Sequence, residues 1–487
     1  MKKTFTKLFS TGLLMGLTCI GFAVNAQTAS LTNNGGVPQP AAQTAAPAPY
    51  APNNDFKPAD KVAGEKTSTA KAAAEDTSWK PQRRVWGYTF GDFYYLSHAD
   101  NDFVGATGVP EGGAGALSKR GSETMYNGVP TYRNAFQFRR LYLGYDYEIT
   151  KKFKAEVLLA SEPNANTGSV TGTSIQNGDN LVDGKMAFWI KNFNLRVRDL
   201  WTGTDFVIGE MSTPGFALNE PGTNGPVSLS ESTWAYRSIE KTITDFHKNN
   251  SYDIGAALQG TFDPATKNFG YVAMVGNNSQ ASLLSAASAN TGFYKIFYGD
   301  LWGKFANNHL YVDIYGDYAK TAPATATVPG QEHNMLKLFV AYLSTPINIG
   351  AEIYTQKIAS GVNSVTTATP PVTTPEDATV SGLSFWVRGQ IVKNLNYFAR
   401  FDSYNPNTKF NAADIYTINT NYGSYNPTNK EQFYTAGLDY NPTKNVHFEP
   451  NFWLVDYTDN RSSTTTGYVA PDHTLVFRFT FFYTFGK

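Results

Sequence analysis

Apolar and polar residues alternate with a period of two in many short segments of this chain. In "VDIYGDYA", Ile314 falls on one face and Asp313 falls on the other. The final segment, "TLVFRFTFFYTFGK", places Phe477 and Phe479 on one face and Arg478 on the opposite face. Successive side chains of a β-strand point to opposite faces, so the pattern predicts strands with one apolar and one polar side. We therefore expect Arg478 to face water.

Two kinds of connection separate these segments. Short ones such as "EITKKFKAE", "IVKNLNYF" and "YNPTKNVHF" are typical of tight hairpin turns. Long, polar connections alternate with them near residues 99–132, 162–183, 213–250, 277–292, 320–333, 358–381, 405–430 and 458–473. Eight long and seven short connections divide the chain into sixteen candidate strands.

This alternation of loop lengths indicates a fold class. An even number of antiparallel strands, with short turns on one side and long loops on the other, is the signature of an outer-membrane barrel. A soluble sandwich or propeller has no physical reason to segregate its loops by length. The sequence therefore predicts an all-β fold, a transmembrane antiparallel β-barrel over 84–487. We expect sixteen strands, with eighteen as the alternative, short periplasmic turns and long extracellular loops.

One predicted strand breaks the alternation. In "AFQFRRLYLGYDYE", the apolar face shifts by one residue at Arg139 and Arg140. A β-bulge would explain the shift, because one extra residue reverses the side-chain parity. Phe side chains that lie above the bilayer would explain it as well. The sequence leaves both explanations open.

The N-terminal part of the chain is predicted to be processed and unstructured. Residues 1–26 combine early lysines, a short apolar run and a small-residue cleavage site at Ala26, which is typical of a secretory signal peptide. Cys19, the only cysteine, lies within it. Residues 27–83 are rich in Pro, Ala and Thr and predict a disordered periplasmic leader. No later stretch approaches the roughly 20 apolar residues of a spanning helix, so a membrane span here requires a barrel.

Composition narrows the function classes. The 40 Lys and Arg balance the 40 Asp and Glu, which gives no sign of a nucleic-acid partner. Aromatic residues make up 14% of the chain although the mean hydropathy is −0.34, as expected of alternating membrane strands. The six histidines show no paired ligand spacing, and no hydrolase or phosphate-binding motif is present. The sequence therefore predicts no enzyme, no metal site and no cofactor.

Parity places charges of both signs on the inner face of the predicted barrel. The residues that we expect to line a channel are Arg139, Arg140, Lys154, Glu156, Arg196, Arg198, Asp313, Lys337, Arg388, Arg400, Asp402 and Arg478. These charges could instead pair across the barrel and fill it. A sixteen-stranded barrel is too wide for side chains alone to plug, so we expect an aqueous channel whose charges set its selectivity.

The third long connection, 213–250, differs from the other loops. It carries Trp234 and Tyr236 beside Arg237, Glu240 and Lys241. Its aromatic side chains need another surface of the protein to pack against. We expect it to fold into the lumen as a constriction loop. An external lid or an oligomer contact is the alternative.

Three segments together resemble a known family. "RRLYLGYDYEITKKFKAEVLLA", "FVIGEMSTPGFALNE" and "WAYRSIEKT" are similar, in this order, to segments of the phosphate-selective porin O/P-type family. The resemblance implies a sixteen-stranded porin, a homotrimer and a third loop folded into the barrel. The chain departs from the family pattern at "STPGF" and "YRSIEK", which leaves the sign of the preferred ion open.

These observations predict a porin in a bacterial outer membrane. Its partners would be outer-membrane lipid and the small hydrophilic solutes or ions that diffuse through it. A substrate-specific channel for phosphate, another anion or an oligosaccharide is one alternative. A non-conducting adhesin or assembly barrel is the other.

Overall fold

The computed structural model describes the part of the chain that forms the predicted barrel. The described residues are 79–98, 132, 134–161, 181–182, 185–186, 188–215, 242–247, 251–278, 294–320, 332–344, 347–365, 369–410, 415–418, 429–459 and 473–486. All of them belong to the unit Glu75–Lys487. The predicted signal peptide lies outside them, as does the leader up to residue 78. The leader was predicted to extend to residue 83, but Gln82 and Arg83 already belong to the first strand.

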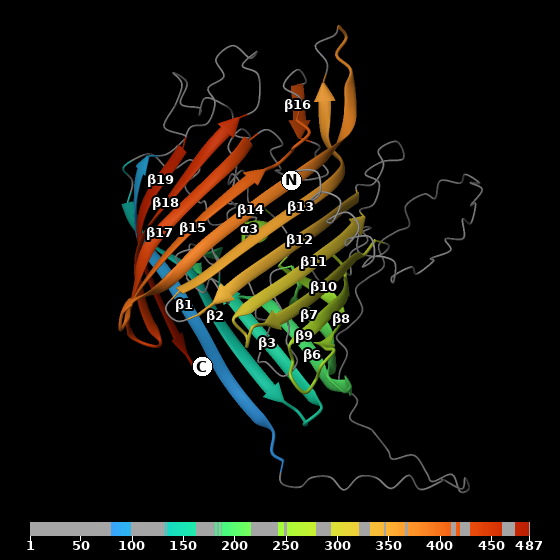
Figure 1. Ribbon diagram of the computed structural model, residues 1–487, viewed down its shortest axis with the longest axis vertical. Coiled ribbons are helices and arrows are strands. Elements are labelled where there is room, and N and C mark those ends of the chain that lie inside the picture. Colours follow the sequence, from blue (N-terminus) through green and yellow to red (C-terminus); the bar gives the residue numbers. More distant parts are fainter. Residues whose placement is uncertain are drawn as a thin grey trace, which may run out of the picture. The chain divides into compact units, whose positions relative to one another are not determined.

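Sixteen antiparallel strands close into a barrel (Figure 1). They are β1 (Gln82–His98), β2 (Asn134–Glu148), β3 (Phe153–Ser161), β6 (Trp189–Trp201), β7 (Thr204–Ser212), β8 (Tyr252–Thr261), β9 (Phe269–Gly276), β10 (Ile296–Phe305), β11 (Leu310–Lys320), β12 (Glu332–Leu343), β13 (Ile347–Val365), β14 (Thr373–Val392), β15 (Leu395–Asn405), β17 (Asn429–Thr443), β18 (Val446–Asp459) and β19 (His473–Phe485). Strand β1 pairs with β2 along one edge and with β19 along the other. The first and last strands thus leave no free edge. The predicted fold class is confirmed, with sixteen barrel strands rather than eighteen.

Exposure in the barrel is the reverse of that in a water-soluble protein. On β19, Phe477 is 49% exposed and Phe479 is 45% exposed, whereas Arg478 between them is only 4% exposed. On β11, Ile314 is exposed and Asp313 is buried. An apolar outer face with charges inside suits a barrel surrounded by lipid, as the period-two pattern predicted. Among the described residues, no helix is long and apolar enough to cross a membrane.

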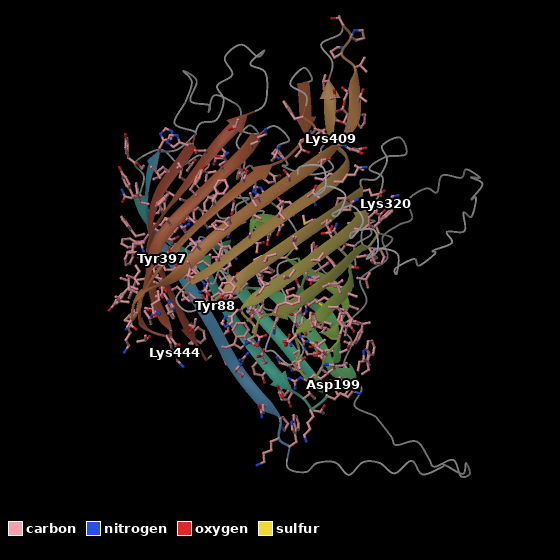
Figure 2. The ribbon with its side chains drawn as sticks, viewed as in Figure 1. Tyr88, Asp199, Lys320, Tyr397, Lys409 and Lys444 are labelled. Carbon is pink, nitrogen blue, oxygen red and sulfur yellow. The ribbon has the colours of Figure 1, made fainter. Side chains whose placement is uncertain are left out.

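Short connections gather at one end of the barrel. The seven short ones are between two and seven residues long. In Figure 2, Asp199 and Lys444, which belong to two of these hairpins, lie at the lower end, and Lys320, which precedes a long connection, lies higher. In the two-residue turn between β14 and β15, Asn394 has φ 65°, a left-handed conformation that Asn tolerates better than most residues. The short turn predicted in "IVKNLNYF" therefore has a conformational basis.

A β-bulge explains the irregular parity in β2. Phe90 pairs with Arg140 and Gly91 pairs with Phe138, so Arg139 is the extra residue. The bulge lets both Arg139 and Arg140 lie buried on the inner side, at 4% and 7% exposure. Of the two explanations that the sequence left open, the bulge is confirmed.

Two predicted loops contain regular structure. Strand β13 continues past the barrel to Val365, and strand β14 begins beyond the barrel at Thr373. Together they form a long hairpin at the top of Figure 1. A short strand, β16 (Ile415–Ile418), pairs with the outer part of β13. The predicted long connections 358–381 and 405–430 therefore contain strand pairing that the sequence analysis did not predict. A smaller two-stranded hairpin joins β4 (Leu181–Val182) to β5 (Lys185–Met186).

Candidate functional site

A continuous series of ion pairs crosses the inner face of β1, β2, β3, β6 and β7. We call it the paired ladder, and its residues are Arg84, Asp146, Lys154, Glu156, Arg196 and Asp205. Its nitrogen–oxygen distances in this order are 2.6, 3.8, 2.7, 3.9 and 3.1 Å. Opposite charges thus lie next to one another from strand to strand. The predicted lining residues Lys154, Glu156 and Arg196 are brought together here.

A bidentate pair extends this arrangement toward the short turns. The Arg198 guanidinium donates to both carboxylate oxygens of Glu148, at 2.7 and 3.1 Å. Arg198 is half-buried, unlike the more central ladder residues. Two parallel N–H···O bonds fix both side chains more firmly than a single contact.

Asp92 on β1 links this strand to β19, the strand with which β1 closes the barrel. It accepts hydrogen bonds from Arg478 and from the Thr480 hydroxyl. The Arg139 guanidinium lies 3.5 Å from the same carboxylate. Arg478 also lies 4.0 Å from the centre of the Trp453 ring. The prediction that Arg478 faces water was wrong, because Asp92 and Trp453 enclose it on the inner face.

The opposite part of the inner face is rich in carboxylates. We call this the acidic wall, and its residues are Asp253, Asp300, Asp313, Asp317 and Glu352 on strands β8, β10, β11 and β13. All five are at most 6% exposed. Some of their oxygens are satisfied, since Asp253 accepts from the Tyr298 hydroxyl at 2.8 Å and Asp317 from the Tyr315 hydroxyl at 2.5 Å.

The centre of the acidic wall has few donors. Neither carboxylate oxygen of Asp300 or of Glu352 accepts a hydrogen bond from the described residues. Lys337 on β12 lies 3.5 Å from Glu352 and also donates to the carbonyl oxygen of Gly215. A buried carboxylate needs water, a cation or a proton to offset its desolvation. The wall therefore gathers buried acidic side chains on one part of the inner face.

The third long connection reaches this interior at both of its described ends. Gly215, near its start, contacts Lys337 on β12. Near its end, the short helix α3 (Ile243–Phe246) places Phe246, which is fully buried, 6.2 Å from the Phe433 ring and 6.4 Å from the Trp453 ring. The predicted constriction residues Trp234, Tyr236, Arg237, Glu240 and Lys241 lie outside the described residues.

The residue after α3 makes a second contact with the barrel wall. The His247 ring stacks on Tyr404 with a centroid distance of 3.4 Å and an interplanar angle of 2°. Its Nε2 lies 3.9 Å from a Glu431 carboxylate oxygen. A loop end held by a stacked ring and a carboxylate has a fixed place against β15 and β17.

Ten of the twelve predicted channel-lining residues are buried on the inner face. They are Arg139, Arg140, Lys154, Glu156, Arg196, Asp313, Lys337, Arg400, Asp402 and Arg478, and the half-buried ones are Arg198 and Arg388. Arg400 donates to both oxygens of Asp402 at 2.8 and 2.9 Å, and the Ser384 hydroxyl donates to Asp402 at 2.6 Å. Their role in conduction stays a prediction.

Sequence reasoning missed several inner residues. Asp92, Asp205, Asp300 and Glu352 were not predicted, although each lies at an inward position of an alternating strand. A stricter application of period two, as in "YGDLWGK" around Asp300, would have found them.

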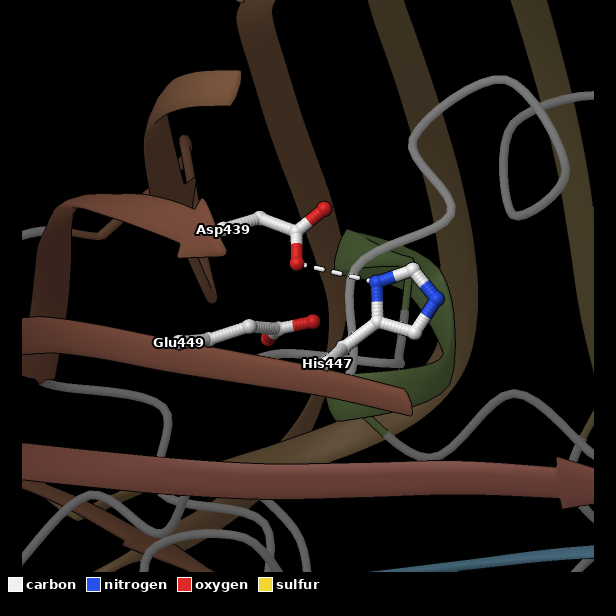
Figure 3. A group of neighbouring side chains, drawn as sticks. All are labelled: Asp439, His447 and Glu449. Atoms are coloured by element: carbon white, nitrogen blue, oxygen red, sulfur yellow. Dashed lines mark hydrogen bonds and ion pairs between the residues drawn. The ribbon is translucent and has the colours of Figure 1, made fainter. Parts of the chain in front are cut away.

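A cluster of possible metal ligands was missed as well. Asp439 on β17 lies beside His447 and Glu449 on β18, with one donor atom of each within 4.8 Å of the others (Figure 3). The sequence predicted no metal site because the histidines lack paired spacing. A His-x-Glu pair on one strand, with an Asp across a two-residue turn, was the signal that the sequence offered.

The fold is shared with known outer-membrane proteins. The outer membrane channel DcaP of Acinetobacter baumannii matches with a TM-score of 0.50 and 11% identity, over 83% of this chain and 97% of that chain. An anion-selective porin from Comamonas acidovorans matches with 0.47 and 11%, over 83% and 100%. A loop L8 deletion mutant of OmpT, an outer membrane protein of Vibrio cholerae, matches with 0.47 and 10%, over 83% and 99%. No family model matches the sequence, and no curated protein matches it. The likeness to DcaP supports the barrel fold.

Proposed function

We propose that this chain is a channel of a Gram-negative outer membrane, through which small hydrophilic solutes or ions diffuse. One observation carries the proposal: a closed sixteen-stranded barrel has an apolar outer face and a charged inner face. Barrels of sixteen to eighteen strands leave an aqueous channel. Charges that line such a channel would attract or repel the solutes that enter it.

Cations are the preferred ions in this proposal. Among the described residues, the buried charged side chains comprise thirteen Asp and Glu but only eight Lys and Arg. Six of the eight basic residues lie on β2, β3, β6 and β19, where acidic partners neutralise several of them. The acidic wall has mainly Lys337 to offset it. This distribution favours a weak cation preference over the phosphate or anion selectivity of the resembled family.

The third long connection is proposed to narrow the channel. The contacts of Gly215 with β12, and of Phe246 and His247 with β15, β17 and β18, support an inward course for it. Its residues Trp234, Tyr236, Arg237, Glu240 and Lys241 would then lie near the solute path. Replacing Arg237 with Ala should increase the cation preference, because one positive charge near the path is removed. A reversal potential identical to that of the wild type would exclude Arg237 from the path.

Conductance in a planar bilayer tests the channel itself. The purified, folded barrel should produce stepwise currents in symmetric salt. An adhesin or an assembly barrel would insert without producing them.

The homotrimer remains a prediction. Its test is the molar mass of the protein part of the detergent complex, measured by light scattering.

A further inference from the structure

Asp439, His447 and Glu449 converge on the inner face next to a two-residue turn. Asp439 is 3% exposed and Glu449 is 1% exposed, whereas the His447 side chain keeps 20% of its surface accessible. His447 Nδ1 lies 2.9 Å from one Asp439 carboxylate oxygen. Figure 3 shows the Glu449 carboxylate below this pair and the other ring nitrogen pointing away from both acids.

Strand register explains why the three side chains meet. Tyr440 pairs with Phe448 and Gly437 pairs with Asn451, which places Asp439 opposite Glu449 across the β17–β18 hairpin. His447 precedes Glu449 by two residues and therefore points to the same face. The hairpin is closed by only Lys444 and Asn445, so the ligand set belongs to one rigid local unit.

The arrangement places two buried carboxylates directly opposite one another. Like charges in this position repel, and each carboxylate loses hydration on burial. One imidazole by itself, neutral or protonated, does not offset two negative charges. A divalent cation between the three donors offsets both negative charges at once.

We propose that Asp439, His447 and Glu449 bind one divalent transition-metal ion of the Zn²⁺ class. One imidazole and two carboxylates are ligands that Zn²⁺ accepts at about 2.0–2.2 Å. At that bond length, neighbouring donor atoms lie roughly 3 to 3.5 Å apart, so the 2.9 Å Asp439–His447 contact is close to a coordination edge. All three donor atoms lie within 4.8 Å, so Glu449 needs only a small movement to complete the site.

Neighbouring residues orient the proposed ligands. The Asn396 side-chain amide donates to the second Asp439 oxygen at 3.2 Å, which leaves the first oxygen directed at His447. The Phe482 ring lies 5.2 Å from the His447 ring and limits its rotation. Residues that hold ligands in this way typically change metal affinity by about 10–100-fold when mutated.

Three protein ligands leave coordination positions for water or solute. The accessible part of His447 gives an entry path from the barrel interior. The proposed site is therefore one that binds metal exchangeably near the short-turn end of the barrel. It needs a folded barrel but not a conducting one, so it and the proposed function can fail separately.

Calorimetric titration of Zn²⁺ into the folded full chain in detergent tests the site, after treatment with a chelator. We expect one saturable site per chain. Either His447→Gln or Glu449→Gln should weaken its affinity by about 10-fold or more. Asn396→Ala should weaken it less. X-ray absorption at the zinc edge should report one nitrogen and two carboxylate ligands.

His333→Gln is the matched control. His333 Nε2 also faces a buried carboxylate, at 3.8 Å from Asp317, but the described residues bring no third ligand to it. This variant should bind Zn²⁺ like the wild type. The proposal is overturned if the wild type shows no stoichiometric site, or if His447→Gln and Glu449→Gln both bind as tightly as His333→Gln. Should His447→Gln fail to fold, Glu449→Gln and Asn396→Ala decide by the same criterion.

Discussion

The paired ladder and the acidic wall lie on the inner face of the same barrel, but they differ in how their charged side chains are paired. In the ladder, neighbouring side chains carry opposite charges, such as Lys154 beside Glu156 on β3 and Arg196 on β6 beside Asp205 on β7. In the acidic wall, Asp300 and Glu352 lack hydrogen bonds from the described residues. Both regions follow the same period-two rule, so parity decides only which way a side chain points. The residues around each side chain decide whether its charge is paired.

Breaking the ladder should have the largest effect, and this effect should be on stability. Arg196→Met leaves Glu156 and Asp205 buried without their shared cation. Removing one partner of a buried ion pair costs about 3 kcal/mol. Urea unfolding of the barrel in detergent measures the loss.

A double variant separates charge loss from packing loss. Arg196→Met combined with Asp205→Asn removes both partners and should recover part of the stability. If the single and double variants unfold at the same urea concentration as the wild type, the ladder has no structural role.

Neutralising the acidic wall should have a smaller effect, and this effect should be on selectivity. Asp300→Asn with Glu352→Gln removes two buried carboxyl groups of the wall. An ionised carboxylate at about 4 Å contributes about 1 kcal/mol in water, so the cation-to-anion permeability ratio should fall by about fivefold for each negative charge removed. The measurement is the reversal potential across a salt gradient.

A ladder variant provides the matched control for that experiment. Arg196→Gln with Asp205→Asn removes one charge of each sign and keeps the net charge of the interior. Its permeability ratio should stay near the wild-type value. An equal shift of the permeability ratio in both double variants would show that the paired ladder and the acidic wall do not differ in their effect on selectivity.

Shortening the hairpin outside the barrel should have the smallest effect. The paired segments from Val362 to Val365 and from Thr373 to Glu376 contact neither the ladder nor the acidic wall in the strand register. Replacing residues 362–376 with a short Gly-Ser turn should leave conductance and selectivity unchanged. A changed reversal potential would show that this extension reaches the solute path.

The alternation of short and long connections predicted the barrel. The alternation of side chains along each strand predicted which of them face inward, because the pleat forces successive side chains to opposite faces. It predicted the orientation of Arg478 correctly but not its partner Asp92, which lies 386 residues away in the sequence. Gly215 in the third long connection is one neighbour of Lys337. No local pattern in the sequence predicts this contact.

Two further features could not be predicted from local sequence patterns. The pairing of β16 with β13 joins two of the long, polar connections. The cluster of Asp439, His447 and Glu449 depends on the register across one hairpin. Turn signals located that hairpin, but they did not fix which residues face each other.

The proposed channel is tested most directly by the reversal potential of the wild-type protein in a planar bilayer with a tenfold KCl gradient. We expect stepwise currents and a reversal potential whose sign reports faster passage of K⁺ than of Cl⁻. A folded barrel that conducts no current, or one that passes Cl⁻ faster than K⁺, would contradict the proposal.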